Sequence, residues 1–150
     1  MAIEVLGPRA CRRLLAEVPV GWLAHCEDGV VHMKPVNFTV HEAEVVVRSA
    51  YGETLTAVVQ GQQLTLGAGS FDETTRTGWS VVVTGRARLL GADLVNPGVS
   101  TEEGWAGFTD TVAIAVPLTT VTGRRVGPDM IGRGPGGSTG AASGRPARRP

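Results

Sequence analysis

The stretch RSAYGETLTAVV (48–59) combines residue types that bind anions. Arg48 and Ser49 precede Gly52, after which the pattern predicts a short helix. The first N–H groups of a helix have no partner inside the helix and lie at its positive end, so they suit a phosphate or another anionic group. The guanidinium of Arg48 could add a bidentate clamp. An arginine that simply faces solvent from a sheet is the plain alternative.

A second set of residues could contact a flat ring. Trp79 and Ser80 stand at the start of GWSVVVTGRARLL (78–90), where a predicted strand leaves a loop. An indole offers a flat apolar surface beside a ring. Asn37, two residues after Pro35, could form a hydrogen bond with a ring carbonyl. Each residue also has a structural interpretation, with Trp79 in the core or at a subunit interface and Asn37 at a turn or bulge.

Two histidines raise the question of a metal. Asp28-Gly29 between two β-rich runs predicts a two-residue hairpin, and the resulting register sets His25 opposite His32. With Glu27 nearby, the two imidazoles could ligate zinc. A polar strand face explains the same residues, so no metal is expected. The sequence also offers no convincing Ser–His–Asp or Cys–His arrangement.

Strand alternation assigns faces to this hairpin and to the strand at 78–90. The predicted core face of the hairpin holds Trp22, Ala24, Cys26, Val31 and Met33. Its predicted polar face holds His25, Glu27, His32 and Lys34. In the later strand, a barrel interior is expected to hold Val81, Val83, Gly85, Ala87 and Leu89. The opposite face there holds Ser80, Val82, Thr84, Arg86 and Arg88.

Hydrophobic periodicity predicts a small, mainly β fold. A short amphipathic helix is expected at about 8–18, and a second at 52–61 that ends at Gly61. The predicted strands are 20–27, 30–40, 43–50, 63–69, 78–90 and 110–126. The segments between them include a polar connection at 71–78 and an irregular segment at 91–109. Six strands with two short helices favour a β-barrel over alternating βαβ layers.

Length and composition fit one domain with an aliphatic core. The chain has 150 residues, of which 42% are hydrophobic and only 5% are aromatic. The net charge is zero, but the arginines beyond residue 132 leave the rest of the chain acidic. That part lacks the clustered basic face expected for nucleic-acid binding. The domain is expected at 1–126, followed by a disordered Gly/Ser/Pro/Arg-rich tail at 127–150.

The sequence predicts neither secretion nor a membrane span. Arginines interrupt residues 1–20, so no apolar signal-peptide core is expected there. No run approaches the roughly 20 apolar residues of a membrane helix. The two cysteines, Cys11 and Cys26, are weak support for a disulfide. We therefore expect a cytoplasmic protein with no membrane partner.

Four motifs occur in an order that resembles the pyridoxamine 5′-phosphate oxidase-like family. They are PVNF in the second strand, R-[ST]-x-x-G before the second helix, GWSVVVTGRARLL in the fifth strand and a terminal VTGRR. The resemblance covers roughly residues 10–126. It is most evident for compact, actinobacterial-type members related to nitroimidazole reductases. It implies a flavin-binding split barrel.

The resemblance further implies a homodimer that holds FMN in clefts between its subunits. The segment Lys34, Pro35, Val36 and Asn37 would line the isoalloxazine ring with its backbone. The ribityl chain and phosphate would be held by Arg48, Ser49, Gly52 and Thr54. Trp79 and Ser80 would approach the flavin at the rim, and Arg124 is a weaker candidate for the same pocket.

The chain departs from the family pattern in ways that bear on the cofactor. The family usually carries a lysine where this chain has Thr54, and Glu53 stands beside it. A lost charge-assisted contact is worth about 1.5–3 kcal/mol. With the added carboxylate, the change would weaken FMN binding by about one to three orders of magnitude. In addition, the segment after the fifth strand is short, and Trp22 replaces an arginine common in the family.

Two functions follow from the sequence. The first is an FMN-dependent oxidoreductase, in which a nicotinamide or similar donor passes hydride through the flavin to a small organic acceptor or oxygen. A deazaflavin in place of FMN is a close variant. The second is a flavin-free split barrel repurposed for small-molecule binding or a non-redox biosynthetic step. The absorption spectrum of the purified protein would distinguish the two.

Overall fold

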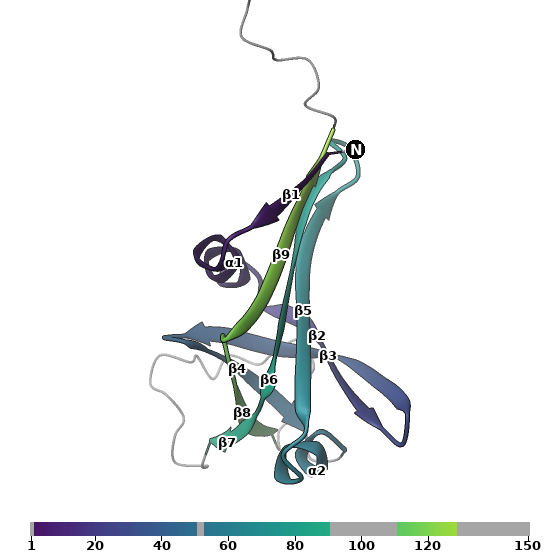
Figure 1. Cartoon of the computed structure of the whole chain (residues 1–150), viewed down its shortest axis with the longest axis vertical. Helices are drawn as coiled ribbons and strands as arrows, with labels where there is room; N and C mark the ends of the chain where they lie inside the picture. The colour runs from purple at the N-terminus through teal and green to yellow at the C-terminus, as the bar shows by residue number, and fades with distance from the viewer. Residues whose placement is uncertain (1, 51–52, 91–110, 129–150) are drawn as a thin grey trace, which may run out of the picture.

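The computed structural model of the chain describes residues 2–50, 53–90 and 111–128. Within these ranges the protein is mainly β, with nine strands and two short helices (Figure 1). The strands are β1 (Ala2–Leu6), β2 (Val20–Glu27), β3 (Val30–His41), β4 (Glu44–Ala50), β5 (Gln63–Asp72), β6 (Thr77–Arg86), β7 (Arg88–Leu90), β8 (Thr111–Pro117) and β9 (Thr120–Gly127). The helices are α1 (Pro8–Leu15) and α2 (Glu53–Val59). The predicted irregular segment 91–109 and nearly all of the predicted tail lie outside the described residues.

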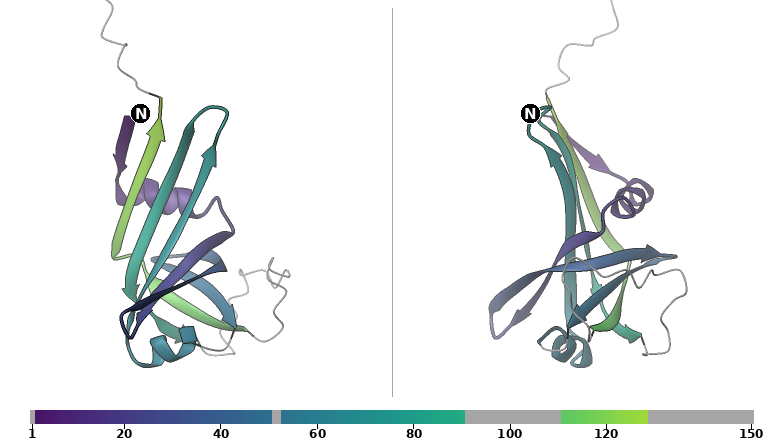
Figure 2. Two further views of the ribbon diagram at one scale, coloured as in Figure 1. Left: turned by 90° about the vertical axis from the view of Figure 1, so that its right-hand side faces the viewer. Right: turned by 180° about the vertical axis from the view of Figure 1, so that it is seen from behind.

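The strands form one antiparallel sheet in the order β1-β9-β6-β5-β2-β3-β4-β8-β7. β6 pairs with β9 and β7 pairs with β8, while β7 continues β6 and β8 leads into β9. The two ends of the sheet are therefore joined by chain continuity, and the sheet curls round into a barrel with β1 at its edge (Figures 1 and 2). The six predicted strands correspond to β2, β3, β4, β5, β6–β7 and β8–β9. The predicted mainly β barrel fold is confirmed.

Two of the predicted strands are each divided into two strands in the structure. The segment 78–90 divides at Ala87 into β6 and β7, and the segment 110–126 divides at Leu118 into β8 and β9. At the second bend the N–H of Leu118 donates to the carbonyl of Ala43 at 2.9 Å. The second bend directly follows Pro117, a residue that interrupts strands because it donates no ladder hydrogen bond, so the sequence does mark this point.

Half of the predicted polar connection 71–78 is strand. β5 continues to Asp72 and β6 begins at Thr77, so only a short turn separates them. A carboxylate oxygen of Asp72 accepts the N–H of Thr74 at 2.8 Å and that of Thr75 at 3.2 Å. This side chain therefore closes the turn, as aspartate commonly does.

Helix α1 follows its predicted pattern but is shorter. It has a proline in its first turn, where the missing N–H costs no helical hydrogen bond. Cys11, Leu14 and Leu15 are buried, and their spacing places them on one side of the helix. The helix ends at Leu15, and Val18 packs against the core from the following loop.

Helix α2 ends as its sequence predicts. Gly61 adopts a left-handed conformation with φ of +70°, which glycine tolerates best. Its N–H donates to the carbonyl of Val58, and the N–H of Gln62 donates to that of Ala57, both at 3.0 Å. This pair of hydrogen bonds is the Schellman motif that terminates many helices.

The β2–β3 hairpin has the predicted turn and register. Asp28 and Gly29 both have positive φ values, 50° and 77°, as a type I′ turn requires. His25 pairs with His32, as the two-residue turn dictates. The register prediction is confirmed along the whole hairpin.

The prediction of which hairpin face meets the core is wrong. Trp22, Val31 and Met33 are 54%, 65% and 61% exposed. Leu23 instead points inward, where it pairs with the buried Leu66 of β5. Both faces of VGWLAHCE carry apolar residues, so alternation shows which side chains share a face but not which face the barrel encloses.

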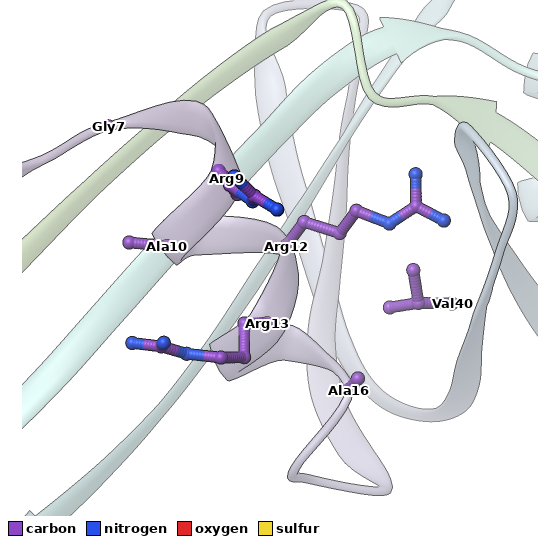
Figure 3. Close-up of a pocket in the computed structure, with 7 residues that line it drawn as sticks. All are labelled: Gly7, Arg9, Ala10, Arg12, Arg13, Ala16 and Val40. Atoms are coloured by element: carbon purple, nitrogen blue, oxygen red, sulfur yellow. The ribbon is translucent and has the colours of Figure 1, made fainter.

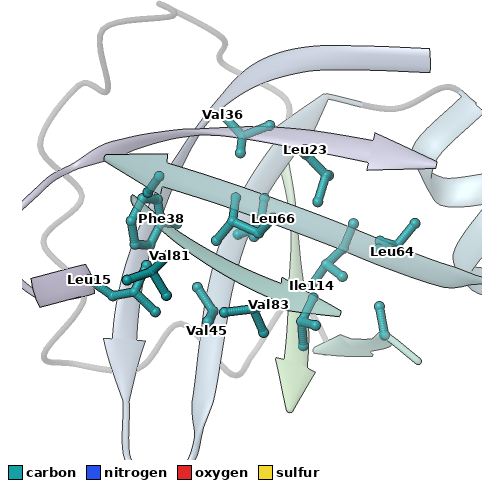
Figure 4. Close-up of a cluster of buried hydrophobic side chains, with 14 of the residues drawn as sticks. Leu15, Leu23, Val36, Phe38, Val45, Leu64, Leu66, Val81, Val83 and Ile114 are labelled. Carbon is teal, nitrogen blue, oxygen red and sulfur yellow. The ribbon is translucent and has the colours of Figure 1, made fainter. Parts of the chain in front are cut away.

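Aliphatic side chains fill the barrel interior (Figure 4). The large side chains that are fully buried are Leu15, Leu23, Leu64, Leu66, Ile114, Val45, Val47, Val81, Val83 and Val116. On β6, Val81 and Val83 take the interior positions that the sequence predicts. Leu89 does not, because it lies on the short β7 and is 41% exposed.

Candidate functional site

Several predicted cofactor contacts lie on the side of the sheet that points away from the core, which we call the outer face. Strand pairing and burial place Pro35, Asn37, Arg48, Ser80 and Arg124 on it. Apolar neighbours of these residues, such as Val36 and Val81, point inward and are buried. The alternation of each strand therefore separates this set from the core.

Arg48 and Asn37 form a cross-strand pair between β4 and β3. Both side chains are half-buried. The Nε atom of Arg48 is buried and has no hydrogen-bond partner. A buried donor that stays unpaired costs about 1–3 kcal/mol, and more when it is charged. This pair is therefore the part of the outer face best suited to receive an anionic acceptor.

Ser80 and Arg124 form a second cross-strand pair, between β6 and β9. Ser80 is half-buried, and its other neighbour across the strands is Gly69 of β5. Arg124 is exposed, and its neighbour on β1 is the exposed Val5. A hydroxyl and a guanidinium thus stand side by side on an otherwise apolar surface.

The two pairs flank the place where the sheet splits. β2 and β5 are paired only from Trp22–Gly67 to Ala24–Thr65. β2 and β5 also lie between the strands that carry Asn37 and Ser80, so these two residues are at least three strand spacings apart, or roughly 14 Å or more. One copy of the chain therefore places both pairs on one face but does not bring them into a single pocket.

The remaining predicted contacts with described side chains point toward the core. Val36 is buried in the barrel. Lys34 pairs with the inward-facing Leu23 and is half-buried. Trp79 packs against the core and pairs with Arg125, on the side opposite to Ser80. The indole and the hydroxyl predicted to border one ring thus leave the strand in opposite directions.

The predicted phosphate segment is described only in part. Gly52 lies outside the described residues. The backbone of Ser49 pairs with Val112 in the sheet, and Thr54 lies in the first turn of α2. The order of Arg48 on a strand and a helix shortly after it agrees with the prediction.

The two histidines of the hairpin stack on each other. Their ring centroids are 5.2 Å apart and their planes are inclined by 16°. His25 is only 7% exposed, and its Nε2 atom is buried without a hydrogen-bond partner. In the part of the chain that the structure describes, no group of three His, Cys, Asp or Glu side chains could hold a metal ion.

Both cysteines are free thiols. Cys11 is buried on the core side of α1 and Cys26 is exposed on β2. Burial raises the pKa of the Cys11 thiol, and its hydrogen bond with the backbone lowers it by less. Neither residue lies beside the Arg48–Asn37 pair in the strand register.

A shallow hollow of about 640 Å³ lies on α1 and the end of β3 (Figure 3). The residues that line it are Gly7, Arg9, Ala10, Arg12, Arg13, Ala16 and Val40. Arg12 extends toward Val40 (Figure 3). None of the predicted cofactor contacts lines this hollow, and its arginines form the solvent side of an amphipathic helix.

The largest feature missed by sequence reasoning is an apolar surface on the outer face. We call the outward-facing residues of β1, β9, β6, β5, β2 and β3 the outer patch. Its exposed large hydrophobic residues are Ile3, Val5, Trp22, Val31, Met33, Phe71 and Val82. Part of the signal was present in the sequence, because β2, β3 and β6 carry apolar residues on both sides, as in sheets that are covered twice.

The sequence profile of the family described as pyridoxamine 5′-phosphate oxidase matches residues 8–125. The chain belongs to this family. The match spans the barrel from α1 nearly to the end of β9, so it covers both cross-strand pairs of the outer face. No curated protein matches the sequence.

Solved structures of flavin-binding proteins share the fold. An FAD-binding protein from Mesorhizobium loti superposes with a TM-score of 0.69 at 22% identity, over 83% of this chain and 97% of that one. An FAD-binding protein from Mycobacterium smegmatis gives 0.62 at 28% identity, over 83% and 99%. A flavocytochrome from Azotobacter vinelandii gives 0.62 at 15% identity, over 83% and 70%. None of the helices in the described ranges is long and apolar enough to cross a membrane.

Proposed function

We propose that this protein is a flavin-dependent oxidoreductase that acts as a homodimer, with FMN as the first candidate cofactor and a deazaflavin as its variant. A nicotinamide or similar donor would supply hydride, and a small organic molecule or oxygen would accept it. The family membership and the flavin-binding structural neighbours support this reaction class. We propose that the protein acts in the cytoplasm.

The observation that carries the proposal is the buried, unpartnered Nε of Arg48 beside Asn37. A guanidinium held half-buried on a strand is well suited to a phosphate, since it can donate two parallel hydrogen bonds. Asn37 can donate to or accept from a ring carbonyl or ring nitrogen within reach. The residues present therefore fit a phosphorylated, planar cofactor.

Two copies of the chain would complete the site. Within one chain the Arg48–Asn37 pair and the Ser80–Arg124 pair are too far apart to line one pocket. If two outer faces pack together, the first pair of one copy can approach the second pair of the other. Each cofactor would then lie between subunits, with Arg124 and Ser80 supplied in trans.

In this arrangement the protein binds and orients, and a bound flavin supplies the hydride chemistry. Arg48 would hold the phosphate, and Asn37 and Ser80 would hydrogen-bond the polar edge of the ring system. The apolar surroundings on the outer patch would exclude water from the reacting face, which strengthens these polar contacts. Lys34 and Trp79 face inward and would act through their backbone and packing.

The absence of the usual lysine at Thr54, with Glu53 beside it, favours the flavin-free alternative. In that case the same outer face would bind another small molecule, or the protein would catalyse a non-redox step. The absorption spectrum of the purified protein and its uptake of FMN distinguish the two functions. A flavin absorption spectrum, or uptake of added FMN, supports the redox function, and colourless protein that takes up no flavin contradicts it.

Arg48→Ala tests the placement of the site. Loss of a charge-assisted contact of about 1.5–3 kcal/mol should weaken FMN binding roughly 10- to 150-fold, measured by fluorescence titration. Arg13→Ala, at an exposed arginine on α1, is the matched control and should leave the affinity unchanged. Equal affinities of the Arg48→Ala variant and the wild type would show that the phosphate binds elsewhere.

Thr54→Lys tests the same site in the opposite direction. The new ammonium group at the start of α2 should raise FMN affinity about tenfold or more, because it restores a charge-assisted contact. The same titration measures the effect, with Thr56→Lys, two residues further along α2, as the control. An unchanged affinity in Thr54→Lys would contradict the assignment of the α2 start to the phosphate.

A further inference from the structure

We propose that the hollow on α1 and the end of β3 is a second ligand site, which binds the phosphate groups of a nucleotide polyphosphate through Arg9 and Arg12. This site is separate from the Arg48–Asn37 pair, and it requires neither a flavin nor a second copy of the chain. The inference therefore goes beyond the proposed function.

Positive charge is concentrated on the side of α1 that borders the hollow. Arg9, Arg12 and Arg13 line the hollow and are exposed, and residues 8–16 include no acidic residue. Because residues three or four apart are neighbours on a helix, Arg12 and Arg13 both lie beside Arg9. Like charges in this arrangement repel each other and slightly destabilise a helix. A bound anion would remove that repulsion.

Within the described residues, no carboxylate neutralises this charge. Glu17 directly follows the hollow in the sequence, and Glu42 lies two residues beyond Val40. Both are exposed, and in the part of the chain that the structure describes neither forms an ion pair with α1. Glu4, which precedes the helix, contacts Arg125 of β9 at 3.2 Å instead. The charge on α1 is therefore open to a ligand from solution.

The directions of the side chains select Arg9 and Arg12 as the contacts. Arg12 extends over the hollow toward Val40 of β3, and the end of Arg9 points toward Arg12 (Figure 3). Arg13 extends in the opposite direction (Figure 3). A guanidinium can donate two parallel hydrogen bonds to one phosphate group. Two guanidinium groups on one side of the hollow therefore suit a ligand with adjacent phosphate groups.

The size and lining of the hollow favour a nucleotide over a small inorganic ion. Its volume of about 640 Å³ lies within the range of about 300–1,000 Å³ that is usual for small-molecule sites. Ala10, Ala16 and Val40 add apolar surface beside the guanidinium groups. A flat base could lie on this surface, and an arginine can stack on such a ring. Because the hollow is shallow, the phosphate groups should supply most of the affinity.

The hollow rests on a fixed part of the fold. Helix α1 packs against β3, β6 and β9. Cys11 lies so close to β9 that an added Cβ at Gly123 would overlap its Sγ atom. The buried side of the helix thus fixes the backbone from which the arginines project, and this lowers the ordering that binding requires. Substitution of the exposed arginines should also leave the thermal midpoint of the chain nearly unchanged.

Isothermal titration calorimetry of the full chain with adenine nucleotides tests the site, at about 50 mM salt and without divalent cations. The affinity should rise about threefold or more with each phosphate from AMP to ADP to ATP, and inorganic triphosphate should compete with ATP. Raising the salt to about 300 mM should weaken ATP binding about threefold or more, because exposed charges are screened. Absence of binding at about 1 mM ATP would overturn the inference, as would equal affinities for AMP and ATP.

Substitutions of single arginines locate the contacts. Arg9→Gln and Arg12→Gln should each raise the Kd for ATP about fivefold or more, and the double variant about 25-fold. Arg13→Gln removes the same charge from the same helix but should raise the Kd less than about twofold, because this side chain points away from the other two. Arg76→Gln, in the exposed turn between β5 and β6, is the control for net charge and should have no effect. Equal effects of Arg12→Gln and Arg13→Gln would indicate a diffuse attraction and contradict the site.

Arg48→Ala separates this inference from the proposed function. The variant should bind ATP as tightly as the wild type, and saturating FMN should leave the affinity for ATP unchanged. Loss of ATP binding in Arg48→Ala, with normal binding in Arg12→Gln, would assign the phosphate groups to the Arg48–Asn37 pair and overturn the inference. Protein that binds ATP through Arg9 and Arg12 but takes up no flavin would support the inference and contradict the proposed function alone.

Discussion

The inner face of the barrel and the outer patch are made by the same strands and both carry large apolar residues, yet only the inner face is filled by its own chain. On β2, Leu23 is buried while its neighbour Trp22 is largely exposed. On β5, Leu66 is buried while Gly67 faces outward with open space above it. On β2, hydrophobicity alone therefore does not separate the two faces. The curvature of the sheet does, because it encloses one side and leaves the other for a partner.

The two faces of the sheet should have different roles. Aliphatic side chains from every wall meet inside the barrel, so the inner face should determine the stability of the monomer. The outer face carries the exposed indole, the arginines and the Arg48–Asn37 pair, so it should determine association and ligand binding. Changes on the two faces should then affect different measurements.

The largest expected contrast is in the reactivity of the two thiols. Cys11 is buried on the core side and Cys26 is exposed near the hairpin turn. At about pH 8, iodoacetamide should modify Cys26 at least a thousand times faster than Cys11, whose reaction requires an opening of the structure. Mass spectrometry over time measures both rates. Similar rates would show that α1 does not protect the core.

The next contrast compares one truncation on each face. Leu66→Ala should lower the free energy of unfolding by about 3 kcal/mol, because it leaves a cavity among fully buried side chains. Val82→Ala removes methyl groups from a side chain that is 39% exposed on the outer face. At a protein concentration low enough to keep the chain monomeric, this change should cost less than about 1 kcal/mol. Urea denaturation measures both, and equal losses would contradict the division of roles.

The smallest effect is expected at an ion pair on the rim of the sheet. Arg125 contacts Glu4 at 3.2 Å, and both side chains are well exposed to solvent. Glu4→Gln should change the free energy of unfolding by less than about 0.5 kcal/mol, as surface pairs usually contribute little. Thermal unfolding at low and high salt measures the change. A loss above 1 kcal/mol would mean that β1 depends on this pair for its position.

The sequence predicted the local features that depend on a few neighbouring residues. Asp28-Gly29 determined the hairpin turn and its register, and Gly61 determined the end of α2, because positive φ values favour these residue types. The motifs also identified the family. Arg48 and Asn37 were predicted as contacts separately, and the structure adds that they are neighbours across two strands.

Features that depend on the closed barrel escaped prediction. The outward orientation of Trp22 could not be derived from VGWLAHCE, because both sides of that strand are apolar. β1 is a short edge strand whose pairing with β9 joins the two ends of the described chain, so no local pattern marks it. The bend at Ala87 is likewise imposed by the circumference of the barrel rather than by a turn residue.

The short pairing between β2 and β5 should make this part of the sheet less stable than the rest. In the described residues, only three residue pairs join β2 of the β2–β3 hairpin to β5 of the β5–β6–β9 half of the sheet. Such a narrow seam should open more often than the longer ladders beside it, so the amides of Trp22 and Ala24 should exchange with deuterium earlier than those of Val81 and Val83. A molecule that binds across both halves should hold β2 and β5 together. Its binding should therefore slow the deuterium exchange of the Trp22 and Ala24 amides.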